Sequence, residues 1–196
     1  MKTLKKFGLI IACFATIVCA WQIYNYFYAP VIPKSQLQKV PKGYSDIVIF
    51  VDFKEPSGRN RFIVYDKSKN KVLLRANCSH RQGGGSTMRN PVFSNQPSSN
   101  CSSLGRYKIV SPGRMSNGYP SYVLEGLDPT NSNARMRQIL IHPSKVVSAF
   151  GFGAYPFYLP LKKVSSGCFT ISFFNFKKLR HIIDRETKPV MLIAYY

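Results

Sequence analysis

The chain begins with a segment whose length and composition match those of a membrane-spanning helix. Lys2, Lys5 and Lys6 precede a run from residue 7 to residue 33 that contains no charged residue. About 20 apolar residues are enough to cross a bilayer as a helix. Lysines on the short leading side keep that end in the cytoplasm and export the remainder. We therefore expect a membrane segment over residues 1–28 and an exported body, in the periplasm or on the outer face of the cytoplasmic membrane.

Two fates of this segment remain open. An uncleaved anchor is favoured, because the uncharged run continues well past the apolar length of a signal peptide. Aromatic residues also gather where the helix would leave the bilayer, as in an interfacial belt, at Trp21, Tyr24, Tyr26, Phe27 and Tyr28. The alternative is a cleaved signal, for which Val18-Cys19-Ala20 provides small residues at a processing site.

The next residues, 29–44, predict a linker with a basic character. They contain three prolines, three lysines and no acidic residue, which is typical of a stiff tether held above a negatively charged surface. A plain solvated tether is the alternative, since runs of charge seldom need a partner. The whole chain carries 28 Lys and Arg against 8 Asp and Glu, a formal net charge of +20. This charge favours anionic envelope polymers or lipid. It does not predict a nucleic-acid partner, since no nucleic-acid-binding motif is visible.

Residues 45–196 predict one mainly β domain. Apolar runs of strand length, separated by turn residues, follow one another along the chain. A single amphipathic helix is expected near the C-terminus, at 174–184. The expected class is a compact β-sandwich or barrel-like domain with a short helix after the cysteine loop. The expected strands are 46–53, 61–66, 71–77, 105–110, 121–127, 137–142, 167–172 and 189–195.

A cysteine and a histidine stand out as a candidate catalytic pair. Cys168 follows a glycine within a β-prone segment, and His142 ends the apolar run that begins at Gln138. A thiol reacts as thiolate, and a neighbouring imidazole is the usual base that produces one. A buried cysteine in a strand is also a common packing residue, so the pair alone leaves both interpretations open. The scattered histidines and cysteines predict no metal site, and no cofactor is expected.

A long polar loop between residues 78 and 103 is a second candidate for site residues. Loops of this length in compact domains usually serve a function. Cys78 and Cys101 bracket it, and in an exported protein they could form a disulfide or remain two free thiols.

The motifs together resemble a known family. Ile141-His142 followed by Ser165-Ser-Gly-Cys-Phe-Thr-Ile-Ser172 resembles the active-site signature of the murein L,D-transpeptidases with a YkuD-type catalytic domain. The closer match is the branch in which another residue replaces the histidine before Gly-Cys. Further segments resemble that branch in the same order, namely 62–66, 79–80, 93–95, 102–107, 124–127 and 133–135.

The resemblance implies a cysteine acyl-transferase of the cell wall. Cys168 would attack the diaminopimelate–D-Ala bond of a peptidoglycan stem tetrapeptide and pass the acyl group to an amine, giving a 3–3 cross-link. His142 would act as the base, and backbone N–H groups at Gly167 and Cys168 would stabilise the oxyanion. The alternatives are an L,D-carboxypeptidase, in which water replaces the amine, and a non-catalytic protein that binds envelope polymers.

Several positions depart from the family pattern. Ser166 stands where a histidine is usual, Thr170 stands where an arginine is common, and Pro143 stands where a glycine is common. A substrate carboxylate would therefore need another cation, for which Arg135 and Arg106 are candidates. His80, Ser166, Thr170 and Arg135 are the predicted substrate-binding residues.

Overall fold

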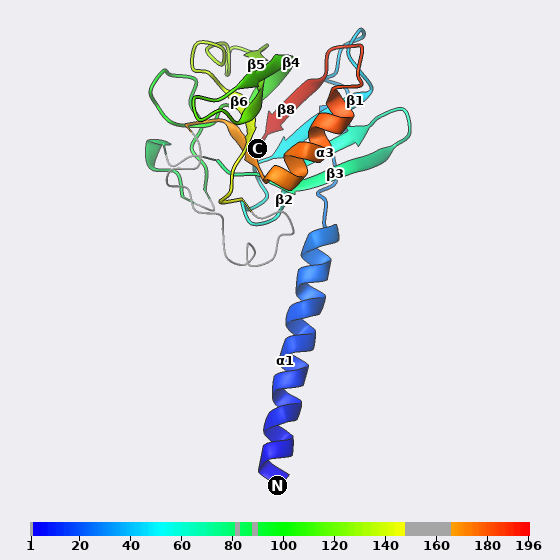
Figure 1. The fold of residues 1–196 in the computed structure, drawn as a ribbon. Coiled ribbons are helices and arrows are strands. Elements are labelled where there is room, and N and C mark those ends of the chain that lie inside the picture. Colours follow the sequence, from blue (N-terminus) through cyan, green and yellow to red (C-terminus); the bar gives the residue numbers. More distant parts are fainter. Residues whose placement is uncertain (1, 81–82, 88–89, 148–165) are drawn as a thin grey trace.

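A long helix stands apart from a mainly β body. The computed structural model describes residues 2–80, 83–87, 90–147 and 166–196. Helix α1 (Lys2–Phe27) extends away from the body, and its side chains from residue 6 onward are almost all exposed (Figure 1). Within the described residues, its portion Lys6–Phe27 is the one helix that is long and apolar enough to cross a membrane. The body contains the remaining helices and all the strands.

The described part of the body forms one eight-stranded sheet with the order β3-β2-β1-β8-β4-β5-β6-β7. Most neighbouring strands are antiparallel, whereas β1 pairs with β8 and β6 pairs with β7 in parallel. A bridge between Ser79 and Thr170 joins the chain just beyond β3 to β7, so the two edges of the sheet meet. The sheet is therefore nearly closed, like a barrel. The strands are β1 (Ile47–Asp52), β2 (Asn60–Asp66), β3 (Lys71–Asn77), β4 (Gly105–Arg114), β5 (Pro120–Gly126), β6 (Leu140–Pro143), β7 (Phe169–Ile171) and β8 (Met191–Tyr195).

The linker packs against the first strand of the sheet. All six residues of β1 are buried, so both faces of this strand are covered, as its uninterrupted apolar sequence predicts. One face belongs to the main core, and the other face carries Val48 and Phe50. Residues of the linker pack against this second face, including Leu37 from the short helix α2 (Lys34–Leu37) and Val40. The linker is therefore not extended and solvated in this structure, because its own apolar side chains cover the sheet. That it holds the body above a negatively charged surface stays a prediction.

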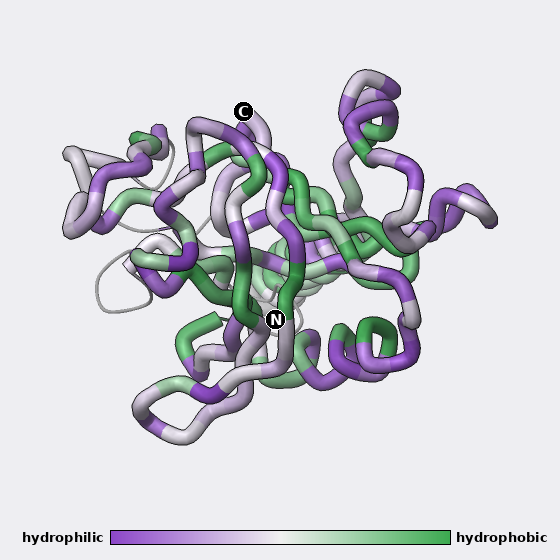
Figure 2. Tube along the Cα trace, turned by 90° about the horizontal axis from the view of Figure 1, so that it is seen from above, coloured by the Kyte–Doolittle hydropathy of each residue, from purple (hydrophilic) through white to green (hydrophobic). Residues whose placement is uncertain are grey.

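Helix α3 (Phe173–Ile183) lies within one residue of its expected position and leads directly out of β7. Ser172 caps it, since its hydroxyl accepts a hydrogen bond from the Asn175 N–H at 3.1 Å. Phe176, Leu179 and Ile183 are buried in the main core, as the helical spacing predicts. Figure 2 shows many hydrophobic segments toward the middle of the body and hydrophilic segments in the outer loops.

The mainly β class with a short helix after the cysteine segment is confirmed, and two strands near the candidate site are shorter than expected. β6 begins at Leu140, because Gln138 adopts a left-handed backbone conformation with φ of 52° that a strand cannot contain. β7 is limited to three residues by the helix that follows it. The loop between β3 and β4 contains a short 3-10 turn, η1 (Gly83–Gly85).

Candidate active site

Cys168 lies immediately before β7, and its thiol contacts backbone groups at the start of β6 and just before it. The residue is 8% exposed. The Leu140 N–H donates a hydrogen bond to Sγ at 3.4 Å, and the thiol donates to the Gln138 carbonyl oxygen at 3.5 Å. Gln138 is the residue with the left-handed backbone, and strained conformations of this kind often accompany functional sites. This conformation places the Gln138 carbonyl oxygen beside the Cys168 sulfur.

The surroundings of the thiol act on its pKa in opposite directions. Burial raises the pKa of Cys168 because a thiolate is poorly solvated there. The Leu140 N–H, the positive charge of Arg137 and the N–H groups of Ser166 and Cys168 itself oppose this rise. The net result is a raised pKa, so the resting group is a thiol surrounded by groups that stabilise its anion. Such a site needs a base to release the nucleophile.

His142 is on β6, the strand beside β7. The parallel register places it opposite Thr170, and it is 3% exposed. Its Nδ1 is 3.1 Å from the Pro143 carbonyl oxygen, and its Nε2 is 3.1 Å from Thr170 Oγ1. A carbonyl oxygen can only accept, so Nδ1 carries the proton and Nε2 accepts from the threonine hydroxyl. Burial lowers the pKa of His142, which keeps the ring neutral.

This arrangement prepares His142 to accept a proton at Nε2. The ring lies two residues beyond Leu140, whose N–H contacts the Cys168 sulfur, and Thr170 lies two residues beyond Cys168 on the paired strand. The register of β6 and β7 places the imidazole and the threonine hydroxyl side by side, while Cys168 precedes the paired part of β7. In this structure the two ring nitrogens of His142 contact Pro143 and Thr170. The transfer of a proton from Cys168 to His142 stays a prediction.

Thr170 has a different position from the one expected for a substrate-binding residue. It is fully buried, its hydroxyl contacts His142, and its carbonyl oxygen accepts the Ser79 N–H at 3.0 Å. These contacts favour a role in holding the imidazole. Ser166 is exposed beside Gly167 and thus remains a candidate for contact with substrate.

His80 is a buried partner of an arginine. Its Nδ1 accepts a hydrogen bond from Arg61 Nη2 at 2.7 Å, and its Nε2 is 2.9 Å from the Thr87 carbonyl oxygen. Burial, aided by the charge of Arg61, lowers the pKa of His80 to about 4. Arg61 is itself fully buried and donates to the Cys78 and Glu55 carbonyl oxygens. This pair fixes the start of the long loop beside β7, and a direct contact of His80 with substrate stays a prediction.

Arg137 was not among the residues predicted from the sequence, yet its guanidinium lies close to the Gly167 that precedes Cys168. Arg137 Nη2 would lie 3.1 Å from a Cβ atom placed on Gly167. Its guanidinium donates to the carbonyl oxygens of Cys101 at 2.5 Å and Ser94 at 2.8 Å, and to the Ser103 hydroxyl at 2.6 Å. Within the described part of the chain it forms no ion pair with a carboxylate. Strand alternation provides no signal for Arg137, because the left-handed backbone of Gln138 separates it from β6.

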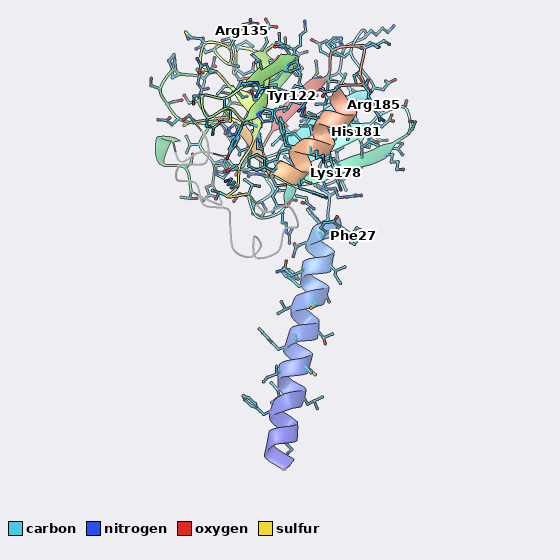
Figure 3. The ribbon with its side chains drawn as sticks, in the orientation of Figure 1. Phe27, Tyr122, Arg135, Lys178, His181 and Arg185 are labelled. Atoms are coloured by element: carbon cyan, nitrogen blue, oxygen red, sulfur yellow. The ribbon has the colours of Figure 1, made fainter. Side chains whose placement is uncertain are left out.

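The two arginines proposed from the sequence lie elsewhere. Arg106 is bound to Asp128, with Nη2 and Oδ1 2.6 Å apart. Arg135 is exposed at the end of the body opposite α1 (Figure 3). Cys78 and Cys101 are both buried free thiols in this structure, which favours the alternative of two unpaired cysteines.

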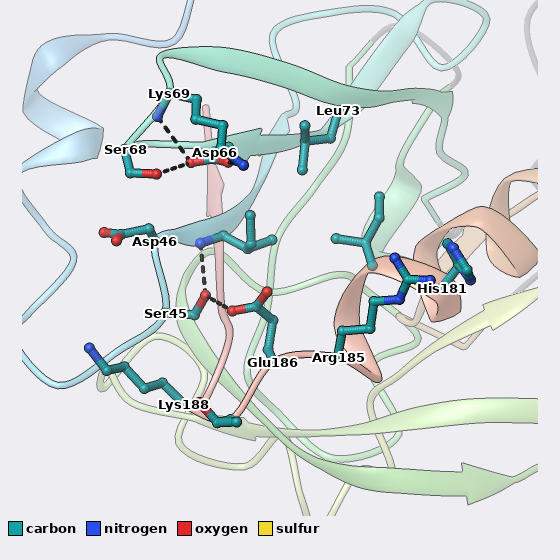
Figure 4. A pocket seen from close by; sticks show the side chains of 13 residues that line it. Ser45, Asp46, Asp66, Ser68, Lys69, Leu73, His181, Arg185, Glu186 and Lys188 are labelled. Atoms are coloured by element: carbon teal, nitrogen blue, oxygen red, sulfur yellow. Dashed lines mark hydrogen bonds and ion pairs between the residues drawn. The ribbon is translucent and has the colours of Figure 1, made fainter.

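A polar pocket at the far end of α3 is a structural junction. It measures about 520 Å³ and lies between the start of β1, the β2–β3 turn and the end of α3 (Figure 4). Its polar groups bind one another. The Ser45 hydroxyl donates to Glu186 at 2.5 Å and accepts the Ile47 N–H at 2.8 Å, while Asp66 binds Ser68 and Lys69.

Solved structures provide distant likenesses to this chain. A search of curated protein sequences finds no significant match. Among solved structures, the chain is similar to the helical cell shape determining protein Pgp2 from Campylobacter jejuni, with 13% identity and a TM-score of 0.47 over 76% of this chain and 46% of that one. A lysine-to-alanine mutant of Pgp2 gives 12% identity and a TM-score of 0.46, over 77% and 48%. The chain therefore spans about half the length of these proteins.

The family itself is shown by sequence. The model of the L,D-transpeptidase catalytic domain matches residues 24–195, which is nearly the whole body together with the end of α1. The chain belongs to the L,D-transpeptidase catalytic-domain family.

Proposed function

We propose that the chain is a membrane-anchored cysteine acyl-transferase that acts on peptidoglycan stem peptides. The observation that carries the proposal is the arrangement at the start of β7. A thiol surrounded by N–H donors lies beside a strand whose histidine is neutral, with the proton on Nδ1 and Nε2 available as an acceptor. This combination supplies a nucleophile, a base and hydrogen-bond donors for an oxyanion.

The proposed acylation step moves one proton and exchanges one bond. Nε2 of His142 exchanges its hydrogen bond with Thr170 for the proton of Cys168. The sulfur attacks the carbonyl carbon of the diaminopimelate–D-Ala bond, the oxyanion is held by backbone N–H groups at Gly167 and Cys168, and the C–N bond breaks. His142 gives the proton to the departing amine of D-Ala, which leaves a thioester on Cys168.

The second step returns the enzyme to its starting state. An acceptor amine attacks the thioester carbonyl, loses its proton to His142, and forms the new amide as the C–S bond breaks. The imidazolium then protonates the sulfur. With water as the acceptor, the same steps release a tripeptide, which is the carboxypeptidase alternative. The buried, neutral resting state protects the thiol until a substrate carbonyl group is in place.

Intact-mass analysis of the full chain with a carbapenem tests the nucleophile. We expect one covalent adduct on the wild type and on Cys101→Ala, which removes a buried neighbouring thiol, and none on Cys168→Ala. His142→Ala should keep the thiol and acylate roughly 10²- to 10⁴-fold more slowly. An unmodified wild type would contradict the proposal.

Muropeptide analysis of cells that express the chain distinguishes the reactions. New 3–3 cross-links that disappear with Cys168→Ala indicate transpeptidation. New tripeptides without cross-links indicate the carboxypeptidase. Unchanged muropeptides, together with the absence of an adduct, would leave the non-catalytic alternative, in which the basic surface binds envelope polymers.

A further inference from the structure

The end of α1 is attached firmly to the body. The Asn60 side chain, at the start of β2, donates toward the carbonyl oxygens of Asn25, Tyr26 and Tyr28 at 2.9–3.0 Å. The Asn25 and Tyr26 carbonyl groups belong to the last turn of the helix, where no N–H within the helix is available to them, and Tyr28 directly follows the helix end. The Tyr28 hydroxyl donates to Glu55 at 2.5 Å. A helix held at its end in this way fixes which side of the body faces the membrane that it crosses.

The side of the body around this junction is basic and partly apolar. Phe27 of α1, Arg75 of β3 and Lys178 of α3 line one small hollow, and Figure 3 shows Lys178 on the part of α3 nearest to Phe27. Arg75, Lys177 and Lys178 are all exposed. Phe174 is 43% exposed, and Lys178 Nζ lies 4.3 Å from the centre of its ring.

These cations are not neutralised by the protein. Among the described residues, none of the five ion pairs involves Arg75, Lys177 or Lys178. The one carboxylate at the junction, Glu55, is already bound by Tyr28 and lies 3.7 Å from Arg59. Basic side chains beside the end of a membrane helix attract anionic lipid headgroups, and an exposed aromatic ring suits the interface.

We propose that Arg75, Phe174, Lys177 and Lys178 form a lipid-binding surface that holds the body against the anionic phospholipid headgroups at the outer end of α1. The proposal rests on the membrane-spanning role proposed for α1. It has a consequence for the site, because α3 carries three of the four residues and begins five residues after Cys168. Binding of α3 to the bilayer orients the cysteine relative to the membrane, toward wall material near the membrane surface.

Single-tryptophan reporters in nanodiscs test this surface in the full chain. Trp21 is the only tryptophan, so Trp21→Phe with Phe174→Trp places one reporter on the surface. We expect brominated phosphatidylglycerol in the disc to quench this reporter much more than brominated phosphatidylcholine. The matched reporter, Trp21→Phe with Arg135→Trp, lies at the opposite end of the body and should be quenched by neither (Figure 3).

Charge variants in the reporter background give the specific result. Each lysine near an anionic surface strengthens binding about fivefold, so Lys177→Gln with Lys178→Gln should weaken the phosphatidylglycerol-bound state roughly 30-fold and reduce quenching to the phosphatidylcholine level. The control, Arg135→Gln with Arg185→Gln, removes the same charge from residues farther from α1 and should leave quenching unchanged (Figure 3). Equal effects of both pairs, or equal quenching of both reporters, would overturn the proposal.

Two further measurements separate this proposal from others. If polyphosphate added to phosphatidylcholine discs changes the Phe174→Trp emission while phosphatidylglycerol does not, the surface binds a soluble polyanion and the lipid proposal fails. Carbapenem acylation of Cys168, measured on the same discs, reports the enzymatic proposal independently. Incorporation into the discs reports the α1 anchor, which all variants leave intact apart from the shared Trp21→Phe change.

Discussion

Gly167 precedes the proposed nucleophile, and a single methyl group at this position should disturb the site measurably. Its φ is 113°, a conformation that residues with a Cβ rarely adopt. A Cβ atom there would lie 2.6 Å from the Cys101 carbonyl oxygen and 3.1 Å from both Arg137 Nη2 and Ile139 Cδ1. The closest atom is backbone, so it cannot move aside as a flexible side chain would.

The cost of Gly167→Ala has two parts. The backbone conformation contributes about 1–3 kcal/mol, and forcing a methyl group into a packed site contributes about 1–3 kcal/mol more. We therefore expect the free energy of unfolding to fall by roughly 2–6 kcal/mol, or the Cys168 segment to shift and relieve part of this strain. Either response changes the thiol environment, so carbapenem acylation of Cys168 should slow as well.

Gly118→Ala provides the matched control. Gly118 also has a positive φ, of 82°, but nothing lies within 4 Å of an added Cβ atom. This variant isolates the backbone cost, about 1–2 kcal/mol, and is not expected to alter Cys168. Thermal unfolding and intact-mass acylation of both variants would decide the question. Equal losses of stability in the two variants, with normal acylation in Gly167→Ala, would refute the steric argument.

Three further predictions concern the groups around the site. Thr170→Val should lower the free energy of unfolding by about 1–3 kcal/mol and slow the acylation of Cys168, because it leaves Nε2 of buried His142 without its hydrogen-bond donor. Thr170→Ser keeps the hydroxyl and should restore both, as measured by thermal melting and by intact mass. Arg137→Gln should shift the pH profile of Cys168 alkylation upward, since it removes a charge that opposes the raised pKa, and Arg137→Lys should shift it less; an unchanged profile would exclude this electrostatic role. The pKa of His80 falls from 6.5 to about 4 on folding, so the unfolded chain binds the proton more strongly. The contribution of His80 to the free energy of unfolding should therefore be fully present above pH 6.5 and should be lost, by about 3 kcal/mol, as the pH falls toward 4. His80→Asn keeps an acceptor for Arg61 and should flatten that decline in pH-dependent melts, whereas exposed His181→Asn should not.

The local pattern of the sequence predicts much of this fold. The apolar run from Ile47 is long enough and continuous enough to identify a strand buried on both faces. The spacing of Phe176, Leu179 and Ile183 locates α3 to within one residue. These elements were predictable because their burial follows directly from a period of two or of 3.6 residues.

Features that depend on contacts between distant segments were not predictable. The linker contains prolines and lysines typical of a tether, yet Leu37 and Val40 cover the outer face of β1. The sequence around Leu37 and Val40 does not show that this face of β1 needs the linker to bury it. Arg137 is similar, because its importance comes from the Cys101 carbonyl oxygen and the Gly167 backbone, which approach it only in the closed sheet. Cys168 and His142 were predicted as a catalytic pair from motif spacing, which indicates chemistry without giving geometry.

The directions of the two pKa shifts determine how this site would work. Burial raises the pKa of Cys168 and lowers the pKa of His142, so both groups are neutral before substrate arrives. A resting thiolate–imidazolium pair would require the opposite shifts. Proton transfer therefore becomes favourable only as negative charge leaves the sulfur for the substrate oxygen, where N–H donors stabilise it. The site would thus gain its reactivity from the bound carbonyl group, which suits a buried thiol that must react with one class of acyl donor.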